Sequence, residues 1–114
     1  MRDNPIKRAL QNGGTAAGAM VFELMAPGLP QICRNAGADF LLYDMEHTGL
    51  GFESLKTQVA LCRGLNVVPM ARVPRGEYHF ISRALDIGAL GSEKSGNKLI
   101  KFENRTNRLI APTT

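Results

Sequence analysis

Apolar residues along this chain gather in short blocks, separated by stretches with a different spacing. Three mainly apolar runs occupy residues 16–24, 39–44 and 67–71, and each ends at or beside a charged residue. Runs of this length without polar alternation are typical of strands covered on both faces of a parallel sheet. The pattern therefore predicts three buried strands, with polar groups delivered where each strand ends.

The intervals between these runs show helical spacing. In the first interval Leu29, Ile32, Cys33 and Ala36 recur at three- and four-residue steps, which predicts a helix with this stripe on the sheet. Gly37 stands where that helix should stop. The same reasoning predicts four helices in all, at residues 4–11, 27–35, 52–62 and 77 to about 86. The first has an N-cap residue, Asn4, followed by Pro5 at its first position; the third has Phe52, Leu55, Val59 and Cys62 on one face.

Alternating strands and helices with short loops predict an α/β fold with a parallel sheet and right-handed crossovers. The sheet could be open or closed into a barrel. In either form the functional groups gather at the carboxyl ends of the strands. The residues expected there are Glu23, Asp44, Glu46, His47 and Arg72.

The pattern changes near residue 91. Gly88, Ala89 and Leu90 look like the entry to a fourth strand, but the sequence becomes polar and basic from Ser92 onward. We therefore expect no complete fourth strand, and at most a marginal edge strand over residues 99–103. The chain divides into residues 1–91 and an unmatched basic tail, residues 92–114, which we expect to be poorly ordered.

Charge follows the same division. The 114 residues suit one domain, and the net charge is +4. Residues 1–91 hold nine Lys and Arg against eight Asp and Glu, whereas the tail holds five against two. This distribution argues against nucleic acid as the main partner, although a tail that binds nucleic acid or an acidic protein remains an alternative. No stretch suits a membrane span or a signal peptide, so a cytoplasmic location is expected.

The two cysteines, Cys33 and Cys62, lie 29 positions apart at apolar helical positions. They form no metal-binding or redox motif with each other. In the reducing environment expected for this chain, both are predicted to be free thiols that pack as small apolar side chains.

The strongest candidate for chemistry is the pair Asp44 and His47, three residues apart at a strand end. A carboxylate that bonds one imidazole nitrogen leaves the other nitrogen able to take a proton, as a general base requires. The same pair could instead bind a divalent metal, or cap the next helix without chemistry. The spacing alone leaves these readings open.

Arg72 follows the next apolar run and should emerge at the same edge. Its planar guanidinium suits a carboxylate or an enolate oxygen, or it could simply pair with Asp44 or Glu46. Glu46 is read as a loop acid or a residue near a metal. His79 is expected to be structural or solvated, and Arg75 and Arg83 are expected to be surface charges. Gly13, Gly14 and Gly18 precede a strand instead of opening a helix, which argues against a phosphate loop.

Three ordered motifs resemble the HpcH/HpaI aldolase family. They are FLLYDMEH at residues 40–47, VPMARVP at residues 68–74 and ALDIGALG at residues 84–91. The stretches NPIK at residues 4–7 and GADF at residues 37–40 also fit. The resemblance covers about residues 4–91.

What the resemblance implies is a partial (β/α)8 TIM barrel: about the first three βα units and the start of a fourth strand. It implies a class II pyruvate aldolase, a carbon–carbon lyase that cleaves 4-hydroxy-2-oxo acids to pyruvate and an aldehyde. Asp44 and His47 would match the dyad that moves a proton through a water, and Arg72 would match the arginine that stabilises the enolate. The family also implies a divalent metal (Mg²⁺, Mn²⁺ or Co²⁺) and a homo-oligomer.

The resemblance stops short of the metal. The family's metal-binding Glu and Asp lie on later strands and have no counterpart in this chain, and Glu93 and Glu103 lie in the unmatched tail. We therefore expect an N-terminal piece of an aldolase that lacks activity alone. A module that binds a keto acid without turnover is the main alternative.

Overall fold

The computed structural model describes residues 4–74, 78–94 and 100–102. Within these ranges the strands are β1 (Gly18–Val21), β2 (Phe40–Asp44), β3 (Val68–Val73), β4 (Gly91–Lys94) and β5 (Ile100–Phe102). The helices are α1 (Pro5–Gln11), α2 (Leu29–Asn35), α3 (Phe52–Cys62) and α4 (Tyr78–Asp86). The predicted alternation of strands and helices is confirmed.

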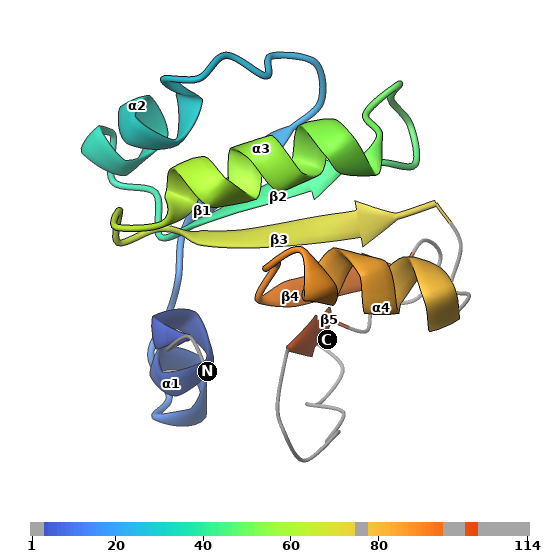
Figure 1. Cartoon of the computed structure of the whole chain (residues 1–114). Coiled ribbons are helices and arrows are strands. Elements are labelled where there is room, and N and C mark those ends of the chain that lie inside the picture. The colour runs from blue at the N-terminus through green and yellow to red at the C-terminus, as the bar shows by residue number, and fades with distance from the viewer. Residues whose placement is uncertain (1–3, 75–77, 95–99, 103–114) are drawn as a thin grey trace.

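The strands form one sheet in the order β1-β2-β3-β4-β5 (Figure 1). The first four run parallel to their neighbours, and β5 runs antiparallel to β4. Because parallel strands end at the same edge, the residues after β1, β2 and β3 meet there. An α/β fold with a parallel sheet is therefore confirmed.

The start of a fourth strand is expected near residues 88–90, but the expectation that the polar sequence from Ser92 onward would not continue it is wrong. Gly91–Lys94 pairs with β3, and the Leu90 amide already donates to the Pro69 carbonyl at 2.8 Å. Strand pairing uses main-chain groups, so the open edge of β3 accepts a segment whose side chains are polar. The marginal edge strand expected near residues 99–103 is confirmed as β5. Of the tail predicted to be poorly ordered, residues 95–99 and 103–114 lie outside the described residues.

The N-cap residue Asn4 bonds helix α1 at its first turn and also bonds the segment just before β4. The Asn4 side chain accepts from the Lys7 amide at 3.1 Å, as predicted for the N-cap, and its amide group donates to the Leu90 carbonyl at 3.1 Å. The buried side chain of Ile6 packs with Leu42 and Met70. Helix α1 therefore covers part of one sheet face, and Figure 1 shows it apart from the other three helices.

The opposite face of the sheet carries the larger core. Alternate strand residues such as Tyr43 and Ala71 pack there against Leu55 and Val59 of α3 and against Ala84 of α4. The predicted inward face of α3 is confirmed, since Leu55, Val59 and Cys62 are fully buried. The period of two along each strand separates this face from the α1 face.

Helix α2 departs from its predicted stripe. Leu29 is buried and Cys33 is half-buried, but Ile32 is 64% exposed and Ala36 is also exposed. The helix has only seven residues and packs beside α3. Of the predicted stripe, only Leu29 and Cys33 therefore pack against the core. Gly37 ends it with a φ of 100°, as expected for a residue in the left-handed region. Both cysteines are free thiols, as predicted.

None of the helices in the described ranges is long and apolar enough to cross a membrane.

Candidate active site

The carboxyl ends of β2 and β3 bring Asp44 and Arg72 together. The two residues are register partners, and both lie on the α1 face of the sheet, in line with Leu42 and Met70. The Asp44 side chain is fully buried, and its Oδ2 lies 3.5 Å from Arg72 Nη1. A buried carboxylate needs such a partner, because removing a charge from water is costly. An ion pair with Asp44 is one of the alternatives that the sequence allows for Arg72, and this ion pair is present.

The second oxygen of Asp44 shapes the loop that follows. Asp44 Oδ1 accepts from the Glu46 amide at 2.8 Å and from the His47 amide at 3.3 Å. The Thr48 hydroxyl donates to the Asp44 carbonyl, and its oxygen accepts from the Leu50 amide at 3.1 Å. An aspartate that bonds the amides after it is a common turn-forming motif. Asp44 therefore holds both the neighbouring strand and the loop.

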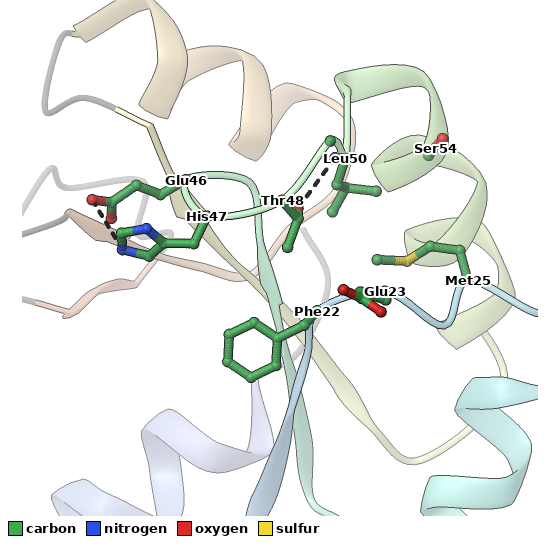
Figure 2. Close-up of a pocket in the computed structure, with 9 residues that line it drawn as sticks. Phe22, Glu23, Met25, Glu46, His47, Thr48, Leu50 and Ser54 are labelled. Atoms are coloured by element: carbon green, nitrogen blue, oxygen red, sulfur yellow. Dashed lines mark hydrogen bonds and ion pairs between the residues drawn. The ribbon is translucent and has the colours of Figure 1, made fainter.

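The His47 imidazole faces Glu46 instead of Asp44. Its Nε2 lies 3.3 Å from Glu46 Oε1, with His47 63% exposed and Glu46 18% exposed. Figure 2 shows these two side chains directed toward each other at the side of the loop. Asp44 thus contacts the backbone of His47, and the contact that orients the imidazole comes from Glu46. The proton-transfer role of the Asp44 and His47 pair stays a prediction.

A cavity of about 670 Å³ opens between the loop after β1 and the loop after β2 (Figure 2). Its lining residues are Phe22, Glu23, Met25, Glu46, His47, Thr48, Gly49, Leu50 and Ser54. The predicted gathering of Glu23, Glu46 and His47 at one edge of the sheet is confirmed by this lining. More than half of these residues are polar or charged, and the carboxyl ends of parallel strands are a usual position for a small-molecule site.

Two buried carboxylate oxygens in this region, Asp44 Oδ2 and Glu46 Oε2, lack a hydrogen-bond donor among the described residues. Asp44 Oδ2 nevertheless has its ion pair with Arg72. A buried oxygen without a donor carries a free-energy cost, which a water or a ligand donor can offset. Of the two residues, Glu46 lines the cavity, whereas the fully buried Asp44 does not.

The residues described do not provide a metal site. Within residues 4–74, 78–94 and 100–102, no three His, Cys, Asp or Glu side chains lie close enough to hold a metal ion. Asp44 already neighbours the Arg72 guanidinium, whose positive charge opposes a cation. The divalent metal implied by the family therefore does not fit these residues alone. Glu103 lies outside the described residues.

Sequence reasoning missed a buried polar network behind the cavity. The Tyr43 hydroxyl donates to Gln58 Oε1 at 3.0 Å, and Gln58 Nε2 donates to the carbonyls of Met25 at 2.9 Å and Ala26 at 3.2 Å. Burial raises the pKa of Tyr43 above its ordinary value, and the nearby Cys62 thiol adds to the shift, so the phenol stays a donor. The available signal was a glutamine on the apolar stripe of α3.

The remaining charged candidates lie away from the cavity. The His79 ring contacts Phe80 on α4 with centroids 4.3 Å apart, which fits its expected structural role. Arg83 is exposed and lies over the Phe52 ring at 4.3 Å, so it is a surface charge with an aromatic partner. Arg75 lies outside the described residues.

Comparison with known proteins finds similar aldolases, in agreement with the family that the sequence motifs resemble. A hydroxypyruvate/pyruvate aldolase from Roseovarius nubinhibens is 34% identical over 86 residues, which is 75% of this chain and 33% of the relative. The crystal structure of an HpcH/HpaI aldolase from Desulfitobacterium hafniense matches 76% of this chain with a TM-score of 0.73 and 29% identity, and 34% of that chain is covered. No model of a protein family matches.

A further solved structure, citrate synthase SbnG, matches 78% of this chain with a TM-score of 0.70 and 26% identity, and 36% of that chain is covered. The fold class is thus that of the first part of a TIM barrel. The predicted resemblance to the HpcH/HpaI aldolase family is confirmed: the chain is similar to the N-terminal portion of these aldolases. It spans about a third of the length of the relatives it matches.

Proposed function

We propose that this chain supplies the proton-transfer and enolate-binding part of a pyruvate aldolase that cleaves 4-hydroxy-2-oxo acids. The observation that carries the proposal is the ion pair of Asp44 and Arg72 at the carboxyl ends of β2 and β3, with the His47 amide bonded to Asp44, in a chain similar to HpcH/HpaI aldolases. Polar groups at this end of a barrel strand are the usual place for catalysis.

Each residue has a defined task in this proposal. His47, acting through a water, takes the proton from the 4-hydroxyl of the substrate. The bond between C3 and C4 then breaks, and the aldehyde leaves. The electron pair of that bond stays with C3 and forms a double bond to C2, so the negative charge appears on the 2-oxo oxygen as an enolate. Arg72 holds that developing negative charge, and a proton returned to C3 completes pyruvate. Asp44 keeps Arg72 and the His47 backbone in place.

The described geometry supports these tasks. The imidazole is exposed enough for a water to reach it, and Glu46 neighbours one nitrogen at 3.3 Å. The Arg72 side chain is only 21% exposed, so its charge acts where water screens it less. No step here is routed through a metal, because the described residues do not form a site for one. A divalent ion would need ligands from elsewhere.

We further propose that the chain has no aldolase activity alone. In the described part, β1 has a single strand neighbour, and Met20 and Phe22 are 39% and 46% exposed. A free edge beside apolar side chains favours association with another polypeptide. The isolated chain should therefore aggregate or self-associate, and a soluble monomer with one sharp thermal transition would contradict this. The cytoplasmic location and the homo-oligomer stay predictions.

The test is reconstitution. The chain is mixed with the separately produced C-terminal two thirds of the Roseovarius nubinhibens relative, and pyruvate release from a 4-hydroxy-2-oxo acid is measured with Mg²⁺, Mn²⁺ or Co²⁺. We expect release from the mixture and none from the chain alone. The matched variants are His47→Ala against His79→Ala, and Arg72→Ala against Arg34→Ala. Only the first of each pair should abolish release.

The outcomes separate the candidate functions. Release by the unaided chain that is lost in His47→Ala would show a working enzyme and overturn the proposed inactivity. Binding of pyruvate or oxalate without metal or turnover would favour the keto-acid-binding module. Equal activity of His47→Ala and His79→Ala in the mixture would overturn the catalytic role of His47.

The alternative of a different kind is that the chain binds nucleic acid or an acidic protein through its basic tail. Nucleic-acid binding that is lost on removal of residues 92–114, with steep salt dependence, would favour it.

A further inference from the structure

Gln58 is a buried polar side chain with three partners. It lies on α3 and is 2% exposed. Among the described residues, Gln58 and Asp44 are the two polar or charged residues that are buried. Its Oε1 accepts from the Tyr43 hydroxyl at 3.0 Å, and its Nε2 donates to the carbonyls of Met25 and Ala26 at 2.9 and 3.2 Å. A side-chain amide in a core helix is thus satisfied by the loop and the sheet.

The partners also determine which way the amide points. Met25 and Ala26 offer only carbonyl oxygens here, so the NH₂ group of Gln58 must face them. The reversed amide would set its oxygen against two carbonyl oxygens and lose both bonds. Tyr43 then has to act as the donor to Oε1, which its raised pKa permits.

Of the two carbonyls that Gln58 bonds, one belongs to Met25, which lines the cavity, and the other to the next residue, Ala26. Phe22, Glu23 and Met25 line the cavity from the loop after β1, while Glu46 to Leu50 line it from the loop after β2 (Figure 2). Much of the first loop is exposed, with Leu24 at 66%. Exposed loops with few buried contacts open easily, so the bonds to Gln58 matter for their position.

We propose that Gln58 is a positioning residue that fixes the loop at residues 22–26 against α3, and so places Glu23 and Met25 at the cavity. The same side chain bonds Tyr43, the residue directly before Asp44 on β2. Gln58 therefore ties the first wall of the cavity to the strand that carries the second. The loop position is independent of the proposed aldolase function; only the identity of the ligand rests on it.

The first experiment observes the loop directly, through methyl NMR of ¹³C-labelled methionines. Met25 reports on the loop, while Met70 is buried in the separate cluster on the α1 face of the sheet and serves as the internal control. In Gln58→Met, which keeps the side-chain length but has no hydrogen-bonding amide, the Met25 signal should move toward its unfolded position. The Met70 signal should not move. Gln31→Met changes an exposed glutamine that pairs with Asn35, and should leave both signals unchanged.

The second experiment uses a variant of nearly the same shape. In Gln58→Glu, an ionised carboxylate can still accept from Tyr43 but cannot donate to Met25 and Ala26. Its protonated form regains one donor, and burial favours that form. The Met25 signal should therefore be displaced at about pH 8 and return toward the native position at about pH 5. Loss of packing alone would not produce this reversal.

These outcomes decide the proposal in each case. A native Met25 signal in Gln58→Met, with the Met70 signal unchanged, would overturn it. If Gln58→Met does not fold, Gln58→Glu decides: reversal with pH supports the positioning role, and a Met25 signal that stays native at both pH values overturns it. A Met25 signal equally displaced at both pH values also counts against it.

If the reconstituted mixture is active, its KM and kcat provide a further test of the role of Gln58. Displacing one wall of the cavity should raise KM for the 4-hydroxy-2-oxo acid about tenfold, the size expected for the loss of one or two buried hydrogen bonds. The value of kcat should change less, since His47 and Arg72 are on other elements. An inactive mixture would count against the proposed function but leave the NMR result valid.

Discussion

Strand β2 has an aspartate–arginine pair at each end, and the two pairs have nearly the same separation. At the carboxyl end, Asp44 Oδ2 lies 3.5 Å from Arg72 Nη1, and the carboxylate is fully buried. At the amino end, Asp39 Oδ1 lies 3.6 Å from Arg34 Nη1, with side-chain exposures of 45% and 34%. Distance does not separate the two pairs, whereas burial does.

The difference indicates which end of β2 suits the proposed chemistry. Asp39 accepts from the Ala17 amide at 3.0 Å and so helps to align β1 with β2, a structural task in contact with water. Asp44 performs a similar task for the next loop, but its side chain is fully buried, beside Arg72 and within three residues of His47. A buried charge pair interacts more strongly and is screened less, which is what an oxyanion site needs.

The largest effect should follow from breaking the carboxyl-end pair. Arg72→Met leaves the buried Asp44 carboxylate without its cation, and we expect the free energy of unfolding to fall by about 3 to 5 kcal/mol. Pulse proteolysis in urea at low protein concentration measures this change. A loss of less than about 1 kcal/mol would show that Asp44 is solvated in solution and would remove the contrast between the two ends.

A second, smaller effect should come from packing at the amino end. A Cβ on Gly18 would lie 2.5 Å from both the ring and the carbonyl oxygen of Phe40, its register partner. The carbonyl belongs to the paired backbone and cannot turn away, so Gly18→Ala should destabilise the fold by about 1 to 3 kcal/mol. Gly49→Ala is the matched control, because nothing lies within 4 Å of its Cβ position. Equal stability of both variants would contradict this packing.

Tyr43, next to Asp44, should make stability depend on alkaline pH. Burial raises the pKa of Tyr43 above its ordinary value of 10.0, so the unfolded chain releases the proton before the folded one does. Stability from this group is therefore complete below about pH 10 and falls as pH rises above it. The stability difference between the wild-type chain and Tyr43→Phe, about 1 kcal/mol near neutral pH, should shrink above about pH 10. A difference that stays constant across this range would argue against a buried phenol.

The smallest effect should come from the amino-end pair itself. Arg34→Met removes a solvent-exposed ion pair, and we expect a loss of about 0.2 to 1 kcal/mol that disappears at high salt. Unfolding measured at low and high ionic strength tests this. A loss as large as that of Arg72→Met, unaffected by salt, would show that burial does not distinguish the two ends.

Much of the architecture was predictable because it depends on local spacing. Runs of apolar residues placed β1, β2 and β3, and the cap at Asn4 and the stop at Gly37 are bonded as expected. The prediction failed where tertiary pairing overrides composition. Gly91–Lys94 is polar, yet it forms β4 because the β3 edge offers main-chain partners. Ile32 has helical spacing but is exposed, because α2 reaches the sheet with only part of its face.

The sequence by itself determined that Asp44, His47 and Arg72 lie at one edge of a parallel sheet, since strand direction and order carry them there. Only the tertiary structure decided how they pair. It set Arg72 against a buried Asp44, turned the His47 imidazole to Glu46, and placed Gln58 behind the cavity loop. Periodicity places residues on faces and ends, whereas hydrogen bonds and burial depend on side-chain directions between distant segments, which local spacing does not encode.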